Sequence, residues 1–350
     1  MRVVILYSDT DSGRPDDKDT LTQRDEIFHT LKNEGCEVSS YAISSFDDIE
    51  EALHCHPRES GDPSCIIMDP RFRGDDKHRE GKRSEFLKEC PDIVFNLVES
   101  FGGSDSHSYL VPGYLDTLGI PYTGCKTNAI FLTRDKCLAK KIMIAHNIPT
   151  PALIGERYIV KSATEHASLG IDETSIVNSI EKAQKLTREK SQQYGGLWFY
   201  EAYIPGREIN LALFSHQGQY TILPIAEILF QGDTKIVDYA AKWDETSSAY
   251  QQTSRQFLNV QTDAALITSL HAIAMRCFAA FDLRGYARID FRVDADGNPF
   301  VLEINTNPCL SMDAGFMAAA LQQGLTHATL IHHLLKSAIY DTTLMPSLHA

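Results

Sequence analysis

Two carboxylates, an amide and a guanidinium near the carboxyl end of the chain have the types and spacing of a metal-binding site. Alternating apolar and polar residues flank Asp296-Gly297-Asn298, a pattern that predicts a β-hairpin. A turn at this triplet sets Asp290 opposite Glu303 and Arg288 opposite Asn305, and the two-residue period of strands puts these four side chains on one face. Opposed carboxylates repel unless a cation lies between them, and carboxylate and amide oxygens suit Mg²⁺.

The apolar residues that alternate with these polar ones indicate how the hairpin packs. Ile289, Phe291, Leu302 and Ile304 fall on the opposite face and are expected in the core. A solvent-exposed face of salt bridges is the alternative for the polar side, but the clean apolar alternation favours a binding site. Arg288, beside the expected metal position, could stabilise negative charge that develops during group transfer.

The elements that must position this hairpin begin with a regular alternation of strands and helices. The expected strands are 3–7, 37–42 and 92–97, and the expected helices are 22–34 and 109–118. Such alternation predicts an α/β domain, with a parallel sheet covered by helices. A generic nucleotide-binding domain without a site of its own would show the same pattern, so the alternation alone does not decide the function.

One stretch of this first part, His54 to Arg83, does not fit the alternation. It is rich in Pro, Gly, Arg and Asp and has no sustained helical period, and its prolines break any longer element. It also resembles peptides encoded by bacterial palindromic repeats that insert in frame into genes. We expect a tolerated, disordered surface insertion, because loop length costs little free energy; a binding loop is the alternative.

After Gly124 the pattern changes, which marks a domain boundary near residue 125. We expect helices at 133–147, 176–190, 263–281 and beyond about 314, and strands at 157–161, 197–203, 209–214 and 221–229. A linker with Pro149 and Pro151 follows the first of these helices. The hairpin with the candidate metal ligands comes after the long helix at 263–281, so several elements precede it and can bring groups to it.

Composition bounds the class of protein. A chain of 350 residues suits two or three domains, and its net charge of −14 argues against a nucleic-acid binder. Its eight cysteines show no paired spacing, which favours reduced thiols over disulfides or a zinc site. We find no membrane-length apolar run and no signal peptide at the start, and we therefore expect a cytoplasmic protein.

Several short motifs in a fixed order carry a resemblance to a known family. The segment RIDFRVDADGNPFVLEINTNP looks like the metal-binding signature of the D-alanine–D-alanine ligase-like ATP-grasp family. IPYTG (120–124), TRDK, YIVK, YEAYIPGREI and DYAAKW (238–243) match it at family spacing, from about Asp92 onward. The resemblance implies an N-terminal parallel β/α domain over 1–125, followed by an α+β ATP-grasp fold with a central subdomain at 126–208 and a C-terminal subdomain at 209–350.

The resemblance also implies how ATP binds. Lys136 and Lys161 would hold its phosphates, and Glu201 and Glu208 would bind the adenine amino group and the ribose hydroxyls respectively. The backbone of Tyr203 and Ile204 would lie at the edge of the adenine. A single lysine in a sequence is usually a solvated surface charge. Here the lysines belong to a series of motifs in the family order, which favours a nucleotide site.

The catalytic and metal positions follow in the same way. The resemblance implies that Asp290, Glu303 and Asn305 ligate two Mg²⁺ ions, with Mn²⁺ as an alternative metal. Further roles are implied for Lys242 at the transferring phosphate, for Arg288 at the acyl phosphate and tetrahedral intermediate, and for Ser168 in a phosphate lid over 163–170. His166, where the family has glycine, we interpret as a satisfied or exposed side chain rather than a catalytic one.

The positions that bind the substrates in the family depart from the family pattern in this chain. No clear equivalent exists for the family glutamate near the first strand that holds the first substrate's ammonium group. The other changed positions are Glu99, Ala167, Trp243, Cys309 and Ala314. Cys309 we interpret as a packing residue rather than a nucleophile. Glu99 and Asp313 would suit a cationic acceptor, although ordinary loop acids are the preferred interpretation of these two.

We therefore predict an ATP-dependent carboxylate–amine ligase that acts through an acyl phosphate, on an amino acid or peptide other than the D-alanine pair. One alternative is an authentic D-alanine–D-alanine ligase with drifted subsites; another is a non-catalytic nucleotide-binding protein. The expected partners are small-molecule carboxylate and amine substrates, without nucleic acid or membrane, and family resemblance suggests a homodimer. A dehydrogenase is disfavoured because no G-x-G-x-x-G follows the first strand.

Overall fold

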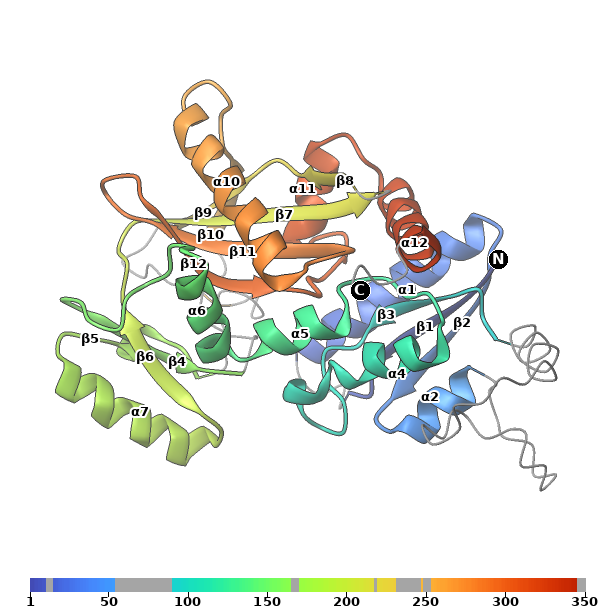
Figure 1. Ribbon diagram of the computed structural model, residues 1–350, viewed down its shortest axis with the longest axis horizontal. Helices are drawn as coiled ribbons and strands as arrows, with labels where there is room; N and C mark the ends of the chain where they lie inside the picture. Colours follow the sequence, from blue (N-terminus) through green and yellow to red (C-terminus); the bar gives the residue numbers. More distant parts are fainter. Residues whose placement is uncertain are drawn as a thin grey trace.

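The computed structural model describes residues 1–10, 15–53, 90–164, 170–216, 219–230, 247 and 253–344. Some sequence-based expectations lie outside the described residues: the insertion at 54–83, the residues His166, Ala167 and Ser168, and Lys242 and Trp243. The described residues form three sheets, which Figure 1 shows with helices against each of them. The domain boundaries drawn from the sequence stay a prediction.

The N-terminal sheet is parallel, as predicted. Its strands are β1 (Arg2–Ser8), β2 (Glu37–Ile43) and β3 (Ile93–Leu97), in the order β2-β1-β3. Its helices are α1 (Pro15–Asn33), α2 (Phe46–Ala52) and α4 (Leu110–Leu118). Val3 and Ile5 share a buried cluster with α1, whereas Val4 and Leu6 pack with α2 and α4. Because both faces of β1 are covered, its apolar run is uninterrupted.

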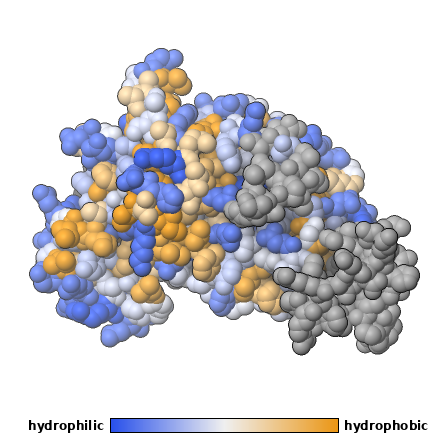
Figure 2. Space-filling model, viewed as in Figure 1, coloured by the Kyte–Doolittle hydropathy of each residue, from blue (hydrophilic) through white to orange (hydrophobic). Residues whose placement is uncertain are grey.

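The middle sheet is small and antiparallel, in the order β5-β4-β6. It consists of β4 (Tyr158–Ser162), β5 (Ile176–Val177) and β6 (Trp198–Ala202), with α7 (Ile180–Tyr194) packed against it. The predicted helix at 176–190 therefore begins too early: its first two residues pair with β4. Ser179 accepts a hydrogen bond from the Lys182 backbone N–H and starts the helix. Figure 2 shows hydrophilic residues along the outer edge where α7 lies.

The largest sheet is antiparallel and carries the strands of the predicted hairpin. Its order is β10-β9-β7-β11-β12, and β8 pairs with β7. The strands are β7 (Arg207–His216), β8 (Gln219–Ile222), β9 (Ala226–Phe230), β10 (Thr253–Phe257), β11 (Tyr286–Val293) and β12 (Pro299–Asn305). The single strand predicted at 221–229 is wrong, because Pro224 interrupts it between β8 and β9.

Helices cover both faces of this sheet over part of its length. One face packs against α5 (Thr127–Arg134), α6 (Lys136–Ala145) and α10 (Ala264–Phe281). The other packs against α11 (Gly315–Gln322) and α12 (His327–Leu344), together with the N-terminal sheet. The helix predicted at 133–147 is two helices, because Asp135 is extended and caps α6 by accepting from the Cys137 and Leu138 N–H groups.

The register of the hairpin confirms the predicted pairing of the polar residues and corrects one apolar residue. Arg288 pairs with Asn305 and Asp290 with Glu303, but a β-bulge follows, and Phe291 pairs with Val301. Val301 is therefore the buried core residue, while Leu302, which was expected in the core, is half-buried. A bulge adds one residue to one strand and shifts the alternation by one position.

Helix α10 is long and apolar enough by composition to span a membrane. Its buried residues, which include Leu270, Ile273 and Phe278, pack in the core between α5, α6 and the large sheet. These contacts bury the side of the helix that faces α5, α6 and the large sheet.

Candidate active site

The polar side chains of the hairpin belong to a face that three neighbouring strands share. Asp290 of β11 lies between Glu303 of β12 and Asn210 of β7, and Arg292 of β11 pairs with Glu208 of β7. Farther along the same strands, this face turns apolar and packs on α11 and α12 through Ala212, Phe214 and Tyr286. One half of the face thus fixes the sheet against the N-terminal region, and the other half is left for polar chemistry.

Asp290 is held in a fixed orientation by two neighbours. Arg288 Nε lies 2.7 Å from Asp290 Oδ1 and Nη2 lies 2.9 Å from Oδ2, a bidentate pair. Asn210 Nδ2 donates to Asp290 Oδ1 over 2.8 Å. Burial acts to lower the pKa of Arg288, but the charge and hydrogen bond of Asp290, together with the charges of Glu303 and Glu208, raise it overall. The carboxylate is therefore fixed as an acceptor on the sheet.

The predicted metal ligands offer the donor atoms that Mg²⁺ requires. Asp290 and Glu303 supply carboxylate oxygens, and the Asn305 amide oxygen is oriented by the Asn307 N–H at 3.0 Å. Within the described ranges there is no cluster of three His, Cys, Asp or Glu side chains. A hard cation that shares two carboxylates and an amide with phosphate oxygens fits this set; a zinc centre does not.

Of the two predicted phosphate-binding lysines, one contacts Glu303 and the other contacts Glu201. Lys136, the first residue of α6, has its Nζ 3.3 Å from Glu303 Oε2. Burial lowers the pKa of Lys136, and the nearby Lys161 charge lowers it further, although Glu303 opposes both. Lys161 of β4 has its Nζ 2.6 Å from Oε1 of Glu201 on β6. The fold therefore brings the middle sheet, α6 and the large sheet to one place.

The residues after β6 pass close to the end of β11. The backbone N–H of Tyr203 donates to the Arg157 carbonyl oxygen at 2.9 Å, and Ile204 next to it is half-buried. Gly206 has a φ of +137°, and a Cβ there would lie 2.0 Å from the Val293 carbonyl oxygen. Only glycine fits this approach.

Sequence reasoning missed Lys140, Asn210 and Arg292. Lys140 Nζ lies 2.6 Å from Glu201 Oε2, and Arg292 Nη2 lies 2.9 Å from Glu208 Oε2. The sequence held a signal for each cation: Lys140 follows Lys136 by one helical turn, and Arg292 continues the alternation of Arg288 and Asp290. Asn210 could be found only from the pairing of β7 with β11.

The loop after β12 meets the N-terminal helix α1. Ser311 Oγ donates to Asp19 Oδ1 at 2.9 Å, and the Met312 N–H donates to Glu26 Oε2 at 2.9 Å. Burial raises the pKa of Asp19 and of Glu26, and the Asp313 charge raises both further. Several acids thus gather where the sequence departs from the family.

Cys309 lies in the same loop. Its Sγ lies 3.0 Å from Ser311 Oγ, and burial, followed by the Asp19 charge, raises its pKa well above the ordinary thiol range. A thiol of this kind stays protonated near neutral pH and is a poor nucleophile. The geometry thus favours packing for Cys309.

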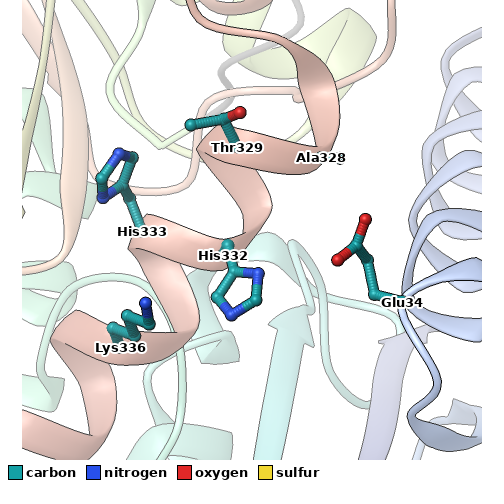
Figure 3. Close-up of a pocket in the computed structure, with 6 residues that line it drawn as sticks. All are labelled: Glu34, Ala328, Thr329, His332, His333 and Lys336. Carbon is teal, nitrogen blue, oxygen red and sulfur yellow. The ribbon is translucent and has the colours of Figure 1, made fainter.

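A separate depression lies between the end of α1 and α12. Figure 3 shows its lining residues: Glu34, Ala328, Thr329, His332, His333 and Lys336. Among the residues that the structure describes, it shares none with the face of β7, β11 and β12. The candidate site is therefore the charged face and not this depression.

Comparison with known proteins agrees with the geometry. The family model for the D-ala D-ala ligase C-terminus matches residues 127–336. A D-alanine–D-alanine ligase of Synechococcus sp. (strain JA-3-3Ab) is 32% identical over 73% of this chain and 79% of its own length. The uncharacterized protein y4sG of Sinorhizobium fredii is 32% identical over 72% of this chain and 76% of its own length.

The fold comparison extends over nearly the whole chain. The crystal structure of the D-alanine–D-alanine ligase from Bacillus anthracis complexed with ATP covers 98% of both chains, with a TM-score of 0.70 and 21% identity. This likeness shows the ATP-grasp fold, which the resemblance implied. The chain belongs to the D-alanine–D-alanine ligase family of ATP-grasp enzymes, and it is a ligase that uses ATP and Mg²⁺ to form a carbon–nitrogen bond, with ADP and phosphate as products.

Proposed function

We propose that this ligase joins an activated carboxylate to an amine substrate that carries a second positive charge, rather than joining two D-alanines. The observation that supports this substrate class is the acidic surrounding of the loop after β12. Asp19 and Glu26 contact this loop from α1, Asp313 belongs to it, and burial and mutual repulsion raise the pKa of the two α1 carboxyls. A cationic group bound there would offset this penalty.

On the nucleotide side, we infer that Lys136 and Lys161 bind the phosphates of ATP. Glu201 accepts from the adenine amino group, Glu208 accepts from the ribose hydroxyls, and the backbone at residues 203–204 borders the base. The position of Lys136 next to Glu303 supports this proposal, because phosphates held by Lys136 would then lie next to the metal ligands. The lowered pKa of Lys136 also fits, since an anionic ligand would favour its charged form.

The transfer steps use the face of the large sheet. Two Mg²⁺ ions, held by Asp290, Glu303 and Asn305, would neutralise phosphate oxygens. Arg288 stabilises charge on the transferring phosphoryl group and on the tetrahedral centre that follows. The substrate carboxylate attacks the γ-phosphorus and ADP leaves; the amine then attacks the acyl carbon and phosphate leaves. Lys242 and Ser168, outside the described residues, are proposed to contact the transferring phosphate.

The test is phosphate release from Mg-ATP with D-alanine alone, and then with pools of amino acids and diamines. We expect release with the basic amino acids or diamines to exceed release with D-alanine, and a product mass equal to the sum of the substrates minus water. Equal or greater release with D-alanine alone would contradict the proposed substrate class. The ligase chemistry itself would be contradicted by ATP hydrolysis without any condensed product.

A D-alanine–D-alanine ligase of cell-wall synthesis is the second candidate. The observation that favours it is the name of the Synechococcus relative at 32% identity. It predicts a D-alanyl-D-alanine product by mass and no added turnover with diamines. The cytoplasmic location, the homodimer and the absence of nucleic-acid and membrane partners stay predictions from the sequence.

A further inference from the structure

Glu201 lies between two lysines and is almost fully buried. It is 1% exposed, with Lys161 Nζ 2.6 Å from one carboxylate oxygen and Lys140 Nζ 2.6 Å from the other. A buried carboxylate is costly without a cationic partner. If Lys161 turns to an ATP phosphate, as the proposed function requires, Lys140 is the cation that remains paired with Glu201.

Lys140 is fully engaged by acceptors of the protein. Its ammonium group contacts Glu201 Oε2 at 2.6 Å, Thr150 Oγ1 at 2.9 Å and the Pro151 carbonyl oxygen at 2.5 Å. An ammonium group has three N–H donors, so these three acceptors use its capacity. Burial, which Glu201 opposes, lowers the pKa of Lys140. The geometry suits a residue that holds Glu201 and not one that binds phosphate.

Arg292 has the corresponding place beside Glu208. It is 4% exposed, it pairs with Glu208 across β11 and β7, and its Nη2 lies 2.9 Å from Glu208 Oε2. Its Nη1 donates to the Gly206 carbonyl oxygen at 3.2 Å. Its guanidinium lies 5.7 Å from the ring centres of both Tyr203 and Phe230. These contacts fix the guanidinium and, through it, one oxygen of Glu208.

We propose that Lys140 and Arg292 are positioning residues that set nucleotide selectivity separately, Lys140 for the base through Glu201 and Arg292 for the sugar through Glu208. The inference rests on the roles that the proposed function gives to these two glutamates. When Lys140 pairs with Glu201, the carboxylate can accept a hydrogen bond from the amino group of adenine, and it repels the carbonyl oxygen that hypoxanthine has at the same position. Without Lys140, the Glu201 oxygen that it holds at 2.6 Å loses its fixed ion pair, and the carboxylate is no longer held in place to accept from the amino group of adenine.

The experiment compares the dissociation constants of ATP, inosine triphosphate and 2′-deoxy-ATP by calorimetry in Mg²⁺ buffer, alongside phosphate release. In Lys140→Met we expect the preference for ATP over inosine triphosphate to fall by about 10- to 100-fold, the range of a lost charge-assisted hydrogen bond. The preference for ATP over 2′-deoxy-ATP should change less than about threefold. Arg292→Met should show the reverse pattern, so that each variant is the control for the other.

Two further pairs of variants separate the outcomes. If Glu201→Gln and Glu208→Gln leave both preferences unchanged, the nucleotide roles in the proposed function are wrong. If these glutamine variants shift the preferences but Lys140→Met and Arg292→Met do not, or shift both alike, the inference is overturned. Lys140→Arg should recover part of the base preference. If Lys140→Met does not fold, Thr150→Val, which removes one anchor of Lys140, should shift the base preference alone and by a smaller factor.

Discussion

The charged face of the large sheet and the loop after β12 lie next to each other in the chain but are built in different ways. On the face, neighbouring strands fix Asp290, Glu303 and Glu208 through backbone pairing. In the loop, the acids come from α1 and from the loop itself, and Glu26 and Met312 are 286 residues apart. A site fixed by strand pairing tolerates little change, whereas a loop site can change its side chains without changing the sheet.

The sharpest test of the charged face is the loss of a proposed metal ligand. Glu303→Gln should lower phosphate release by at least about 1,000-fold. It removes one negative charge from the proposed metal ligands, and it removes the carboxylate that pairs with Lys136. Circular dichroism should show an unchanged fold. Glu189→Gln, at an exposed acid on α7, is the matched control. Activity within about tenfold of the wild type in Glu303→Gln would refute the metal assignment.

The close backbone approach beside the charged face can be tested at Gly206, which lies against the end of β11. Gly206→Ala puts a Cβ 2.0 Å from the Val293 carbonyl oxygen in a residue with a φ of +137°, and we expect a loss of about 2–4 kcal/mol in the free energy of unfolding. Gly119→Ala is the control, because its φ is +67° but nothing lies within 4 Å of its Cβ. It should cost about 1 kcal/mol. Equal losses in denaturant titrations would show that the close approach to β11 is not needed.

Substitutions around the loop after β12 should change the binding of the amine substrate rather than the binding of ATP. Asp19→Asn and Asp313→Asn should each raise the KM for a cationic amine about tenfold and leave the KM for ATP unchanged, since one charge partner is lost at a distance from the nucleotide residues. Steady-state kinetics at varied amine and at varied ATP separate the two. A rise in both KM values would mean that the two regions are not independent.

The smallest effect should appear in the pH dependence of stability. Burial raises the pKa of Asp19, so the folded state binds more protons than the unfolded state between its ordinary and its raised pKa. Stability is therefore lost as the pH rises through this window, and the penalty is complete above the raised pKa. Asp19→Asn removes the penalty, and its Tm relative to the wild type should be about 2 °C higher at pH 7 than at pH 4. A constant difference would contradict a raised pKa.

Local pattern was enough to predict most of the elements and the pairing of the proposed metal ligands. The turn triplet at 296–298 sets the register of the hairpin, so the sequence pattern alone predicts Asp290 opposite Glu303. Boundaries were less predictable: Asp135 divides the expected helix because a cap competes with propagation. The bulge that replaces Leu302 by Val301 in the core depends on how the whole sheet bends, which no short pattern encodes.

The sequence by itself determined the family, the order of the elements and the polar face of the hairpin, because each depends on residues close together in the chain or on a fixed series of motifs. Only the tertiary structure decided which donor group holds which carboxylate. Lys140 and Glu201, Arg292 and Glu208, and Asp19 and Ser311 come from segments far apart in the chain. Their pairing depends on how helices and sheets pack, because burial makes each charge require a partner that the packing must bring within reach.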